Sequence, residues 1–164
     1  MRRVWQDLPM EDRALLNPAF TSVLIARFSG SYQEATSGPA PVTLTFLAVT
    51  MILHGPTRSA LPARTSTNFL SWLENNDEIR IKLPDKAAGI APIIREGLLF
   101  SLANDICRFV PPTMVSLGAR RPRGAPQGRS AEVVQCQRSA MFLGRWLPRA
   151  GGEATVLALL GVRP

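Results

Sequence analysis

Histidine and cysteine are nearly absent from this 164-residue chain, which contains one histidine, His54, and two cysteines, Cys107 and Cys136. A zinc site takes three or four histidine, cysteine or carboxylate ligands at suitable spacing, so no metal centre is expected. Because both cysteines stand in apolar, helix-like surroundings, we expect free buried thiols, with a disulfide between them as the less favoured alternative. We expect His54 to be hydrogen-bonded locally at the end of a helix.

Catalytic motifs are missing as well. The chain has no G-x-x-x-x-G-K-[ST] phosphate loop, and no G-x-G-x-x-G segment follows a strand-like run. A Ser-His-Asp or Cys-His site would have to use His54, and no nucleophile-elbow signature surrounds a serine or cysteine. We interpret Asp77, Glu78 and Asp105 as carboxylates on solvated helix ends. The sequence therefore predicts no catalytic or cofactor-binding residues, and we expect that the protein is not an enzyme.

No apolar run is long enough to cross a bilayer, which takes about 20 residues. The longest, Val42–Leu53, has twelve residues and includes three threonines. The N-terminal residues MRRVWQDLPMEDR lack the apolar region of a secretory signal, so we expect a cytoplasmic protein without a membrane partner. At 46% hydrophobic, the chain can bury one core, and its length suits a single helical domain over residues 1–164.

Lysine is absent after Lys86, and acidic residues are scarce in the last third of the chain. Residues 111–164 contain eight arginines and two glutamates, whereas residues 1–110 contain 11 basic and 10 acidic residues. A basic excess confined to one region indicates an acidic partner surface, either nucleic acid or protein. An arginine-rich genome with solvated surface arginines explains the bias equally well.

Helical signals dominate the first part of the chain. Residues 7–16 predict a short helix, and Asn17 and Pro18 suit the N-cap and first residue of the next one. The β-branched residues of Val42–Leu53 favour a strand, whereas its length and unbroken apolarity favour a buried helix, and we choose the helix. We expect Gly55 to end it in the left-handed conformation.

The central stretch, residues 61–109, is interpreted as two helical pieces joined by an extended linker. Hydroxyl groups of residues 65–67 are expected to cap the first piece. Residues 78–83, EIRIKL, alternate apolar and polar side chains and predict a short strand. Pro84 would then start a helix that is interrupted at Pro92. The helix at residues 42–53, the tight turn after it, a short turn at residues 57–61 and the first helical piece of the central stretch have the spacing of a helix-turn-helix core, which is also that of many small α-bundles.

Residues 118–130, GARRPRGAPQGRS, contain four arginines, three glycines and two prolines, and they follow a strand-like segment at residues 110–117. Two structures stay open for them: a mobile basic loop, or the tip of a β-hairpin wing. The predicted fold class is therefore mainly α, a compact helical domain, with a winged-helix-like form that has a small β-hairpin around residues 110–130.

The C-terminal segment is apolar for a chain end. Ser130 should cap a helix that Gly151 and Gly152 break, and residues 153–160 predict a last helix. That helix is apolar almost all round, so one face can pack on the domain and another can bind a partner. The alternative is that it completes the core and buries Trp146. The candidate interface residues are Arg145, Trp146, Leu159, Leu160, Val162 and Arg163.

Five segments together resemble a known family. They are NPAF at residues 17–20, YQ at 32–33, LPARTSTNFLSWL at 61–73, REGLLF at 95–100 and FLGRWLPRAGGEATVLALLGVRP at 142–164. The set resembles the middle component of bacterial three-component ABC systems, from about Trp5 to the last residue. One departure is Gly97, where alanine is expected, since glycine costs roughly 1 kcal/mol of helix propensity.

The resemblance implies an adaptor without activity or cofactor of its own. Such systems are thought to pair an SMC-like ABC ATPase with a middle protein and an effector in antiphage or anti-plasmid conflict. The middle protein would bridge the two, like the small winged-helix partners of SMC complexes. The alternative is a winged-helix module that binds DNA, non-specifically or through the complex. Its phosphate contacts would then be Arg120, Arg121, Arg123 and Arg129, and with only Gln127 beside them sequence-specific readout is not expected.

Overall fold

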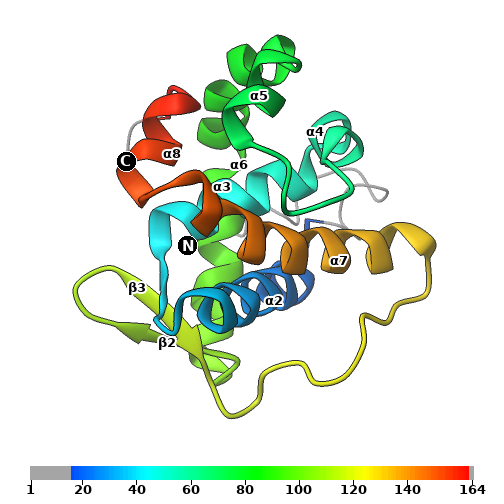
Figure 1. Cartoon of the computed structure of the whole chain (residues 1–164). Helices are drawn as coiled ribbons and strands as arrows, with labels where there is room; N and C mark the ends of the chain where they lie inside the picture. The colour runs from blue at the N-terminus through cyan, green and yellow to red at the C-terminus, as the bar shows by residue number, and fades with distance from the viewer. Residues whose placement is uncertain (1–15, 163–164) are drawn as a thin grey trace.

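The computed structural model describes residues 16–162, so the helix expected over residues 7–16 and the candidate residue Arg163 lie outside or at the edge of the described part. Its helices and strands confirm a mainly α-helical fold with a small antiparallel sheet (Figure 1). In chain order they are α2 (Pro18–Thr36), β1 (Ala40–Pro41), α3 (Val42–Leu53), α4 (Gly55–Ala60), α5 (Phe69–Glu74), α6 (Asp77–Ala103), β2 (Cys107–Val110), β3 (Met114–Leu117), α7 (Ala131–Trp146), the 3-10 helix η2 (Leu147–Ala150) and α8 (Glu153–Leu159).

Helix α2 is the element against which most of the others pack. Asn17 caps it as predicted, since its Oδ1 accepts a hydrogen bond from the Phe20 N–H at 2.7 Å. Leu24 and Phe28 of α2 are fully buried, and α2 contacts α3, α6 and α7. Figure 1 shows α7 lying along α2.

Two glycines allow this close approach. An added Cβ at Gly144 of α7 would lie 2.5 Å from the carbonyl oxygen of Phe28 and 2.9 Å from the backbone nitrogen of Tyr32. At Gly97 of α6 it would lie 2.4 Å from Cγ2 of Thr21. These distances are well inside van der Waals contact, so Gly97, the departure from the resembled pattern, brings α6 close to α2.

Residues 42–53 form the buried helix α3, as predicted. The hydroxyl groups of Thr45 and Thr50 donate to carbonyl oxygens one turn back, at 2.9 and 2.8 Å, so these threonines are satisfied inside the core. The prediction for Gly55 is wrong: it is not left-handed but begins α4, because Pro56 continues the chain as a first-turn helical residue.

The cap predicted for α5 is wrong by a few residues. Asn68, and none of residues 65–67, caps this helix, and its Oδ1 accepts from the Ser71 N–H at 3.0 Å. An asparagine at the N-cap satisfies an N–H group that the helix itself leaves free.

The strand predicted at residues 78–83 is also wrong, because this segment opens α6. That helix has 27 residues and continues through both internal prolines, so Pro84 does not start it. Ile79 and Leu83 are both buried, whereas Ile81 between them is 70% exposed. The buried residues are spaced one helical turn apart, as in a helix with one face on the core. This burial stabilises the helix more than the alternating apolar pattern favours a strand.

The β-hairpin lies earlier than expected. β2 and β3 are antiparallel, with Val110 opposite Met114, so residues 111–113 form the turn. On its other edge β3 pairs with β1, which gives the strand order β1-β3-β2. Residues 118–130 contain no strand, so the wing-tip alternative for this segment is wrong. Instead the segment passes around the outside of the domain from β3 to α7 (Figure 1).

Candidate interaction sites

The residues predicted for a C-terminal interface separate into core and surface. Trp146 is 1% exposed and Leu160 is fully buried, which corrects the assignment of these two side chains to an interface. For Trp146 the structure agrees with the alternative given above, in which its side chain is part of the core. The other described members are Arg145, which is exposed, and Leu159 and Val162, which are partly buried.

Trp146 joins α7 to the loop before α5. Its indole Nε1 donates to the carbonyl oxygen of Thr67 at 2.8 Å, across 79 positions of sequence. Its ring lies edge-on to Phe69 and Trp72, with centroid separations of 5.1 and 5.3 Å. Two of the segments that carry the family resemblance, residues 61–73 and 142–164, therefore meet in this cluster. No spacing in the sequence indicates that contact.

A polar hollow opens beside this cluster, and we call it the arginine hollow. One part, of about 500 Å³, is lined by the end of α2, Thr65, Arg145 and Arg149. A second part, of about 210 Å³, shares Thr65 and Arg149 and extends to Leu70 and Leu159. No ion pair among the described residues includes Arg145 or Arg149. Sequence reasoning found Arg145 but missed Thr65, Leu70 and Arg149. The four-residue spacing of Arg145 and Arg149 could have indicated Arg149, whereas no local pattern connects Thr65 and Leu70 to them.

A separate groove, the apolar groove, lies between α3, α6 and α8. Its volume is about 370 Å³, and its lining includes Phe46, Ala91, Leu157 and Val162, with Arg95 as the one charged side chain. Val162 is thus the predicted interface residue that reaches this groove.

The basic segment, residues 118–130, is held against the body of the domain. Arg27 of α2 donates from Nη1 and Nη2 to the carbonyl oxygens of Gly124 and Ala125, at 2.7 and 3.4 Å. Gln137 of α7 donates to the carbonyl oxygen of Gln127 at 2.6 Å. Burial lowers the pKa of Arg27. The two acceptors are neutral carbonyl groups, so they do not offset this lowering.

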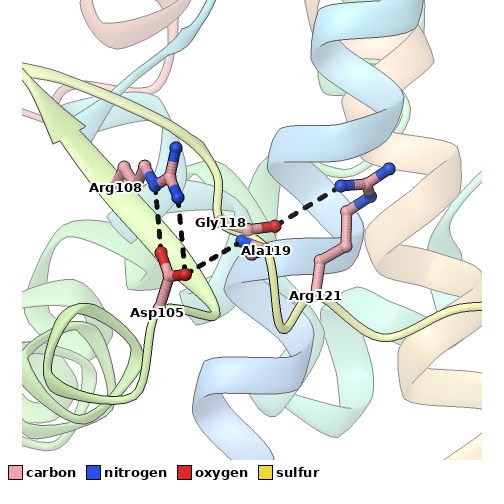
Figure 2. A network of polar contacts seen from close by, with 5 residues as sticks. All are labelled: Asp105, Arg108, Gly118, Ala119 and Arg121. Carbon is pink, nitrogen blue, oxygen red and sulfur yellow. Dashed lines mark hydrogen bonds and ion pairs between the residues drawn. The ribbon is translucent and has the colours of Figure 1, made fainter.

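Asp105 organises the start of this segment (Figure 2). Its carboxylate accepts from Arg108 Nε at 2.9 Å and from the Ala119 N–H at 3.3 Å, and its carbonyl oxygen accepts from the Arg120 N–H at 2.9 Å. The hydrogen bond from Arg108 is the main reason that the pKa of Asp105 lies below its ordinary value. Gly118 passes so close that an added Cβ would lie 2.1 Å from the Asp105 carbonyl oxygen. Asp105 therefore lies in the turn after α6 and is held by hydrogen bonds, whereas the sequence predicted a solvated carboxylate at a helix end.

The four candidate phosphate contacts are all exposed, and no ion pair among the described residues includes them. Arg121 uses one N–H group on the Gly118 carbonyl oxygen at 3.4 Å. The segment thus presents its cations to solvent, on a backbone fixed by Arg27, Gln137 and Asp105. The four residues are Arg120, Arg121, Arg123 and Arg129.

The groups that could carry chemistry are buried or bonded. Cys107 and Cys136 are free and buried, as predicted, and burial raises the pKa of Cys107 to about 11. His54 Nδ1 lies 2.7 Å from Thr57 Oγ1, which confirms its local hydrogen bond. Within residues 16–162 no group of three or more histidines, cysteines and carboxylates could hold a metal ion. In the same residues, every helix is too short or too polar to cross a membrane.

A comparison with family models shows the class of protein to which the chain belongs, the components of ABC-three component systems. The matching model is described as ABC-three component (ABC-3C) system Middle Component 3, and it covers residues 5–164. The chain therefore belongs to this family of middle components, which confirms the resemblance drawn from its five segments. No curated protein and no solved structure matches the chain.

Proposed function

We propose that this protein is a non-catalytic adaptor, the middle component that links an SMC-like ABC ATPase to an effector in antiphage or anti-plasmid defence. The observation that carries the proposal is the family match over residues 5–164, because a component of a multi-protein system works with partner proteins. The arginine hollow and the apolar groove support it, since each offers a concave surface with a distinct chemistry.

The adaptor role is tested by reconstitution from the proteins encoded beside this one. The ATPase, the effector and this chain are purified separately and mixed in pairs and as a set of three. We expect this chain to bind each of the other two, and the ATPase and effector to associate only when it is present. Association of the ATPase with the effector in its absence would contradict the bridging role.

The non-catalytic part of the proposal has its own test. The purified chain should show no hydrolase, nuclease or nucleotidase turnover, because its histidine is bonded to Thr57 and its thiols are buried. Steady turnover that His54→Ala abolishes would contradict it.

The second candidate function is non-specific DNA binding, and two observations favour it. A helix, a short strand, further helices and a hairpin follow one another, with β3 between β1 and β2, which is the element order of winged-helix modules. The exposed arginines of residues 118–130 begin directly after this hairpin, where Asp105 accepts from Arg108 and from the Arg120 backbone. Contacts from these arginines to phosphates would be indifferent to sequence.

This function is tested by the salt dependence of duplex binding. The slope of log K against log salt should be about −0.9 per phosphate neutralised. Replacing Arg120, Arg121 and Arg123 by alanine should flatten the slope by about three such contacts. Arg80→Ala, an exposed arginine near the start of α6, should leave it unchanged. Absence of DNA binding by the wild-type chain at low salt would reject DNA binding and leave the adaptor role standing.

A further inference from the structure

We infer that the arginine hollow is a docking site for an acidic segment of a partner protein, one that also carries an apolar side chain. The inference rests on the adaptor role proposed above and names the surface through which it acts. It joins Arg145 and Leu159, which the sequence predicted at an interface, with Thr65, Leu70 and Arg149, which neither the family match nor the sequence patterns assign to binding.

The charged half of the hollow is built for a carboxylate. Arg145 in the last turn of α7 and Arg149 in η2 both line it, and the hydroxyl of Thr65 adds a hydrogen-bonding group. Glu34 is its one acidic lining residue, and no ion pair joins it to either arginine. Guanidinium groups bind carboxylates through two parallel hydrogen bonds, so two arginines without ion pairs favour an acidic ligand.

The adjoining part is mainly polar, but two leucines line it. Leu70 is 48% exposed although it belongs to a short helix whose other large apolar side chains are buried, and Leu159 lines the same hollow. Arginine is over-represented at energetically important positions of protein interfaces, and Leu70 beside Arg149 offers apolar surface that a partner can bury. A phosphate backbone would engage Arg145 and Arg149 but would leave Leu70 and Leu159 without apolar contacts. The combined surface therefore favours a polypeptide.

The loop that contains Thr67 lies between the two parts of the hollow, and hydrogen bonds within the domain hold it in place. The Trp146 indole bonds the Thr67 carbonyl oxygen at 2.8 Å, and the Thr67 N–H donates to the Arg64 carbonyl oxygen at 3.2 Å. Asn68 then caps α5. A site that is ordered before binding loses less conformational entropy when the ligand arrives. Trp146 thus acts on docking by positioning this loop, while its own side chain stays in the core.

Binding to the purified ATPase and to the purified effector tests the inference. The wild-type chain is titrated against each by calorimetry at two salt concentrations. The charge-reversed variant Arg145→Glu/Arg149→Glu and the apolar variant Leu70→Ser are compared with matched controls. Arg138→Glu reverses an exposed arginine of the same α7, and Ile81→Ser removes an exposed apolar side chain outside the hollow. The neutral variant Arg145→Gln/Arg149→Gln guards against a folding defect from acidic residues at a helix end.

We expect the charge-reversed variant to lose tenfold or more in affinity for one partner, about the loss of a hot-spot residue. The neutral variant should lose less, Leu70→Ser should also bind more weakly, and both controls should bind like wild type. Wild-type binding should weaken with salt more steeply than binding of the charge-reversed variant.

The adaptor role and the docking site can be rejected separately. If the wild-type chain binds neither partner, the adaptor role fails and this docking site with it. If it binds a partner and the charge-reversed variant binds equally well, the adaptor role stands and the docking site is rejected. Loss of duplex DNA binding in the charge-reversed variant, with partner binding unchanged, would likewise reject a protein ligand for the hollow.

Discussion

At the residue scale, Gly97 shows how a missing methyl group sets the distance between two helices. Alanine is the better helix former by about 1 kcal/mol, yet its Cβ at this position would overlap Thr21. We expect Gly97→Ala to lower the free energy of unfolding by roughly 1–3 kcal/mol, as overpacking typically does. Urea denaturation followed by circular dichroism measures this.

Two further variants isolate the cause. Gly89 lies in the same helix with nothing near its would-be Cβ, so Gly89→Ala should stabilise by up to about 1 kcal/mol. Thr21→Ala removes the Cγ2 atom at 2.4 Å but keeps the Cβ at 2.6 Å, so it should relieve part of the overlap, and it leaves no hydrogen bond broken because the buried Thr21 hydroxyl has no partner in the described part of the chain. Gly97→Ala/Thr21→Ala should therefore be more stable than Gly97→Ala alone. A double-mutant cycle without coupling would show that the overlap is not the cause.

Trp146 is the second residue whose role is set by its surroundings. Because it is buried, packs on three other aromatic rings and donates to Thr67, Trp146→Ala should cost roughly 3–5 kcal/mol of stability. Trp146→Phe keeps a ring but loses the donor, so it should cost less. Denaturant midpoints compare the two variants. A loss below about 1 kcal/mol for alanine would mean that the side chain does not belong to the core.

At the element scale, Arg27 should control how easily residues 118–130 leave the domain surface. Arg27→Met keeps the aliphatic stem but removes both hydrogen bonds to the Gly124 and Ala125 carbonyl oxygens. A hydrogen bond to a charged group contributes about 1.5–3 kcal/mol, so local release of the segment should become about tenfold more frequent.

Limited trypsin digestion measures this release, since the segment contains three exposed arginines that trypsin can cleave, Arg120, Arg123 and Arg129, whereas Arg121 precedes a proline. We expect faster cleavage within residues 118–130 in Arg27→Met. Arg138→Met, on an exposed position of α7, should be cleaved like wild type. Equal cleavage of all three proteins would mean that the tether does not hold the segment.

Helix α6 shows why element boundaries escaped the sequence. Its two prolines and the alternating EIRIKL segment are local signals against one long helix, and they misled the prediction. Packing of Ile79, Leu83 and Ile94 on the core outweighs the backbone hydrogen bonds that the prolines remove. By contrast, α2 and α7 begin at Asn17 and Ser130 as predicted, because a cap is an interaction within three residues.

At the scale of the whole molecule, the shifted pKa values predict stability that is highest between about pH 6.5 and 9. Burial, and then Lys86 and Lys82, hold the pKa of His54 below its ordinary value of 6.5. The unfolded chain therefore takes up the proton first, and stability falls as pH drops below 6.5. Burial raises the pKa of Cys107 from 9.0 to about 11, so the unfolded chain ionises first and stability falls as pH rises above 9.

Urea midpoints measured across this pH range test the profile. His54→Asn should flatten the acid side between about pH 7.5 and 5.5. Cys107→Ala should remove a loss on the order of 2 kcal/mol by pH 11 from the alkaline side, and part of the loss should remain because burial also raises the pKa of Cys136. If the loss of stability above pH 9 is the same in Cys107→Ala as in wild type, other titrating groups cause that loss.

The sequence by itself determined the helical class, the caps at Asn17 and Ser130, the buried helix α3 and the membership in the middle component family. Those properties depend on side chains within a turn or two of each other, or on the order of segments along the chain. It could not reveal the arginine hollow, since Thr65 and Leu70 lie more than 70 positions before Arg145 and Arg149.

Only the tertiary structure decided where distant residues meet. It paired β1 with β3 across more than 70 positions, buried Trp146 against the loop that Thr67 belongs to, and placed Arg27 under residues 118–130. It also turned Gly97 from an unfavourable helix residue into a contact point for Thr21. The physical reason is that burial and packing are properties of the assembled core, which no short stretch of the chain contains.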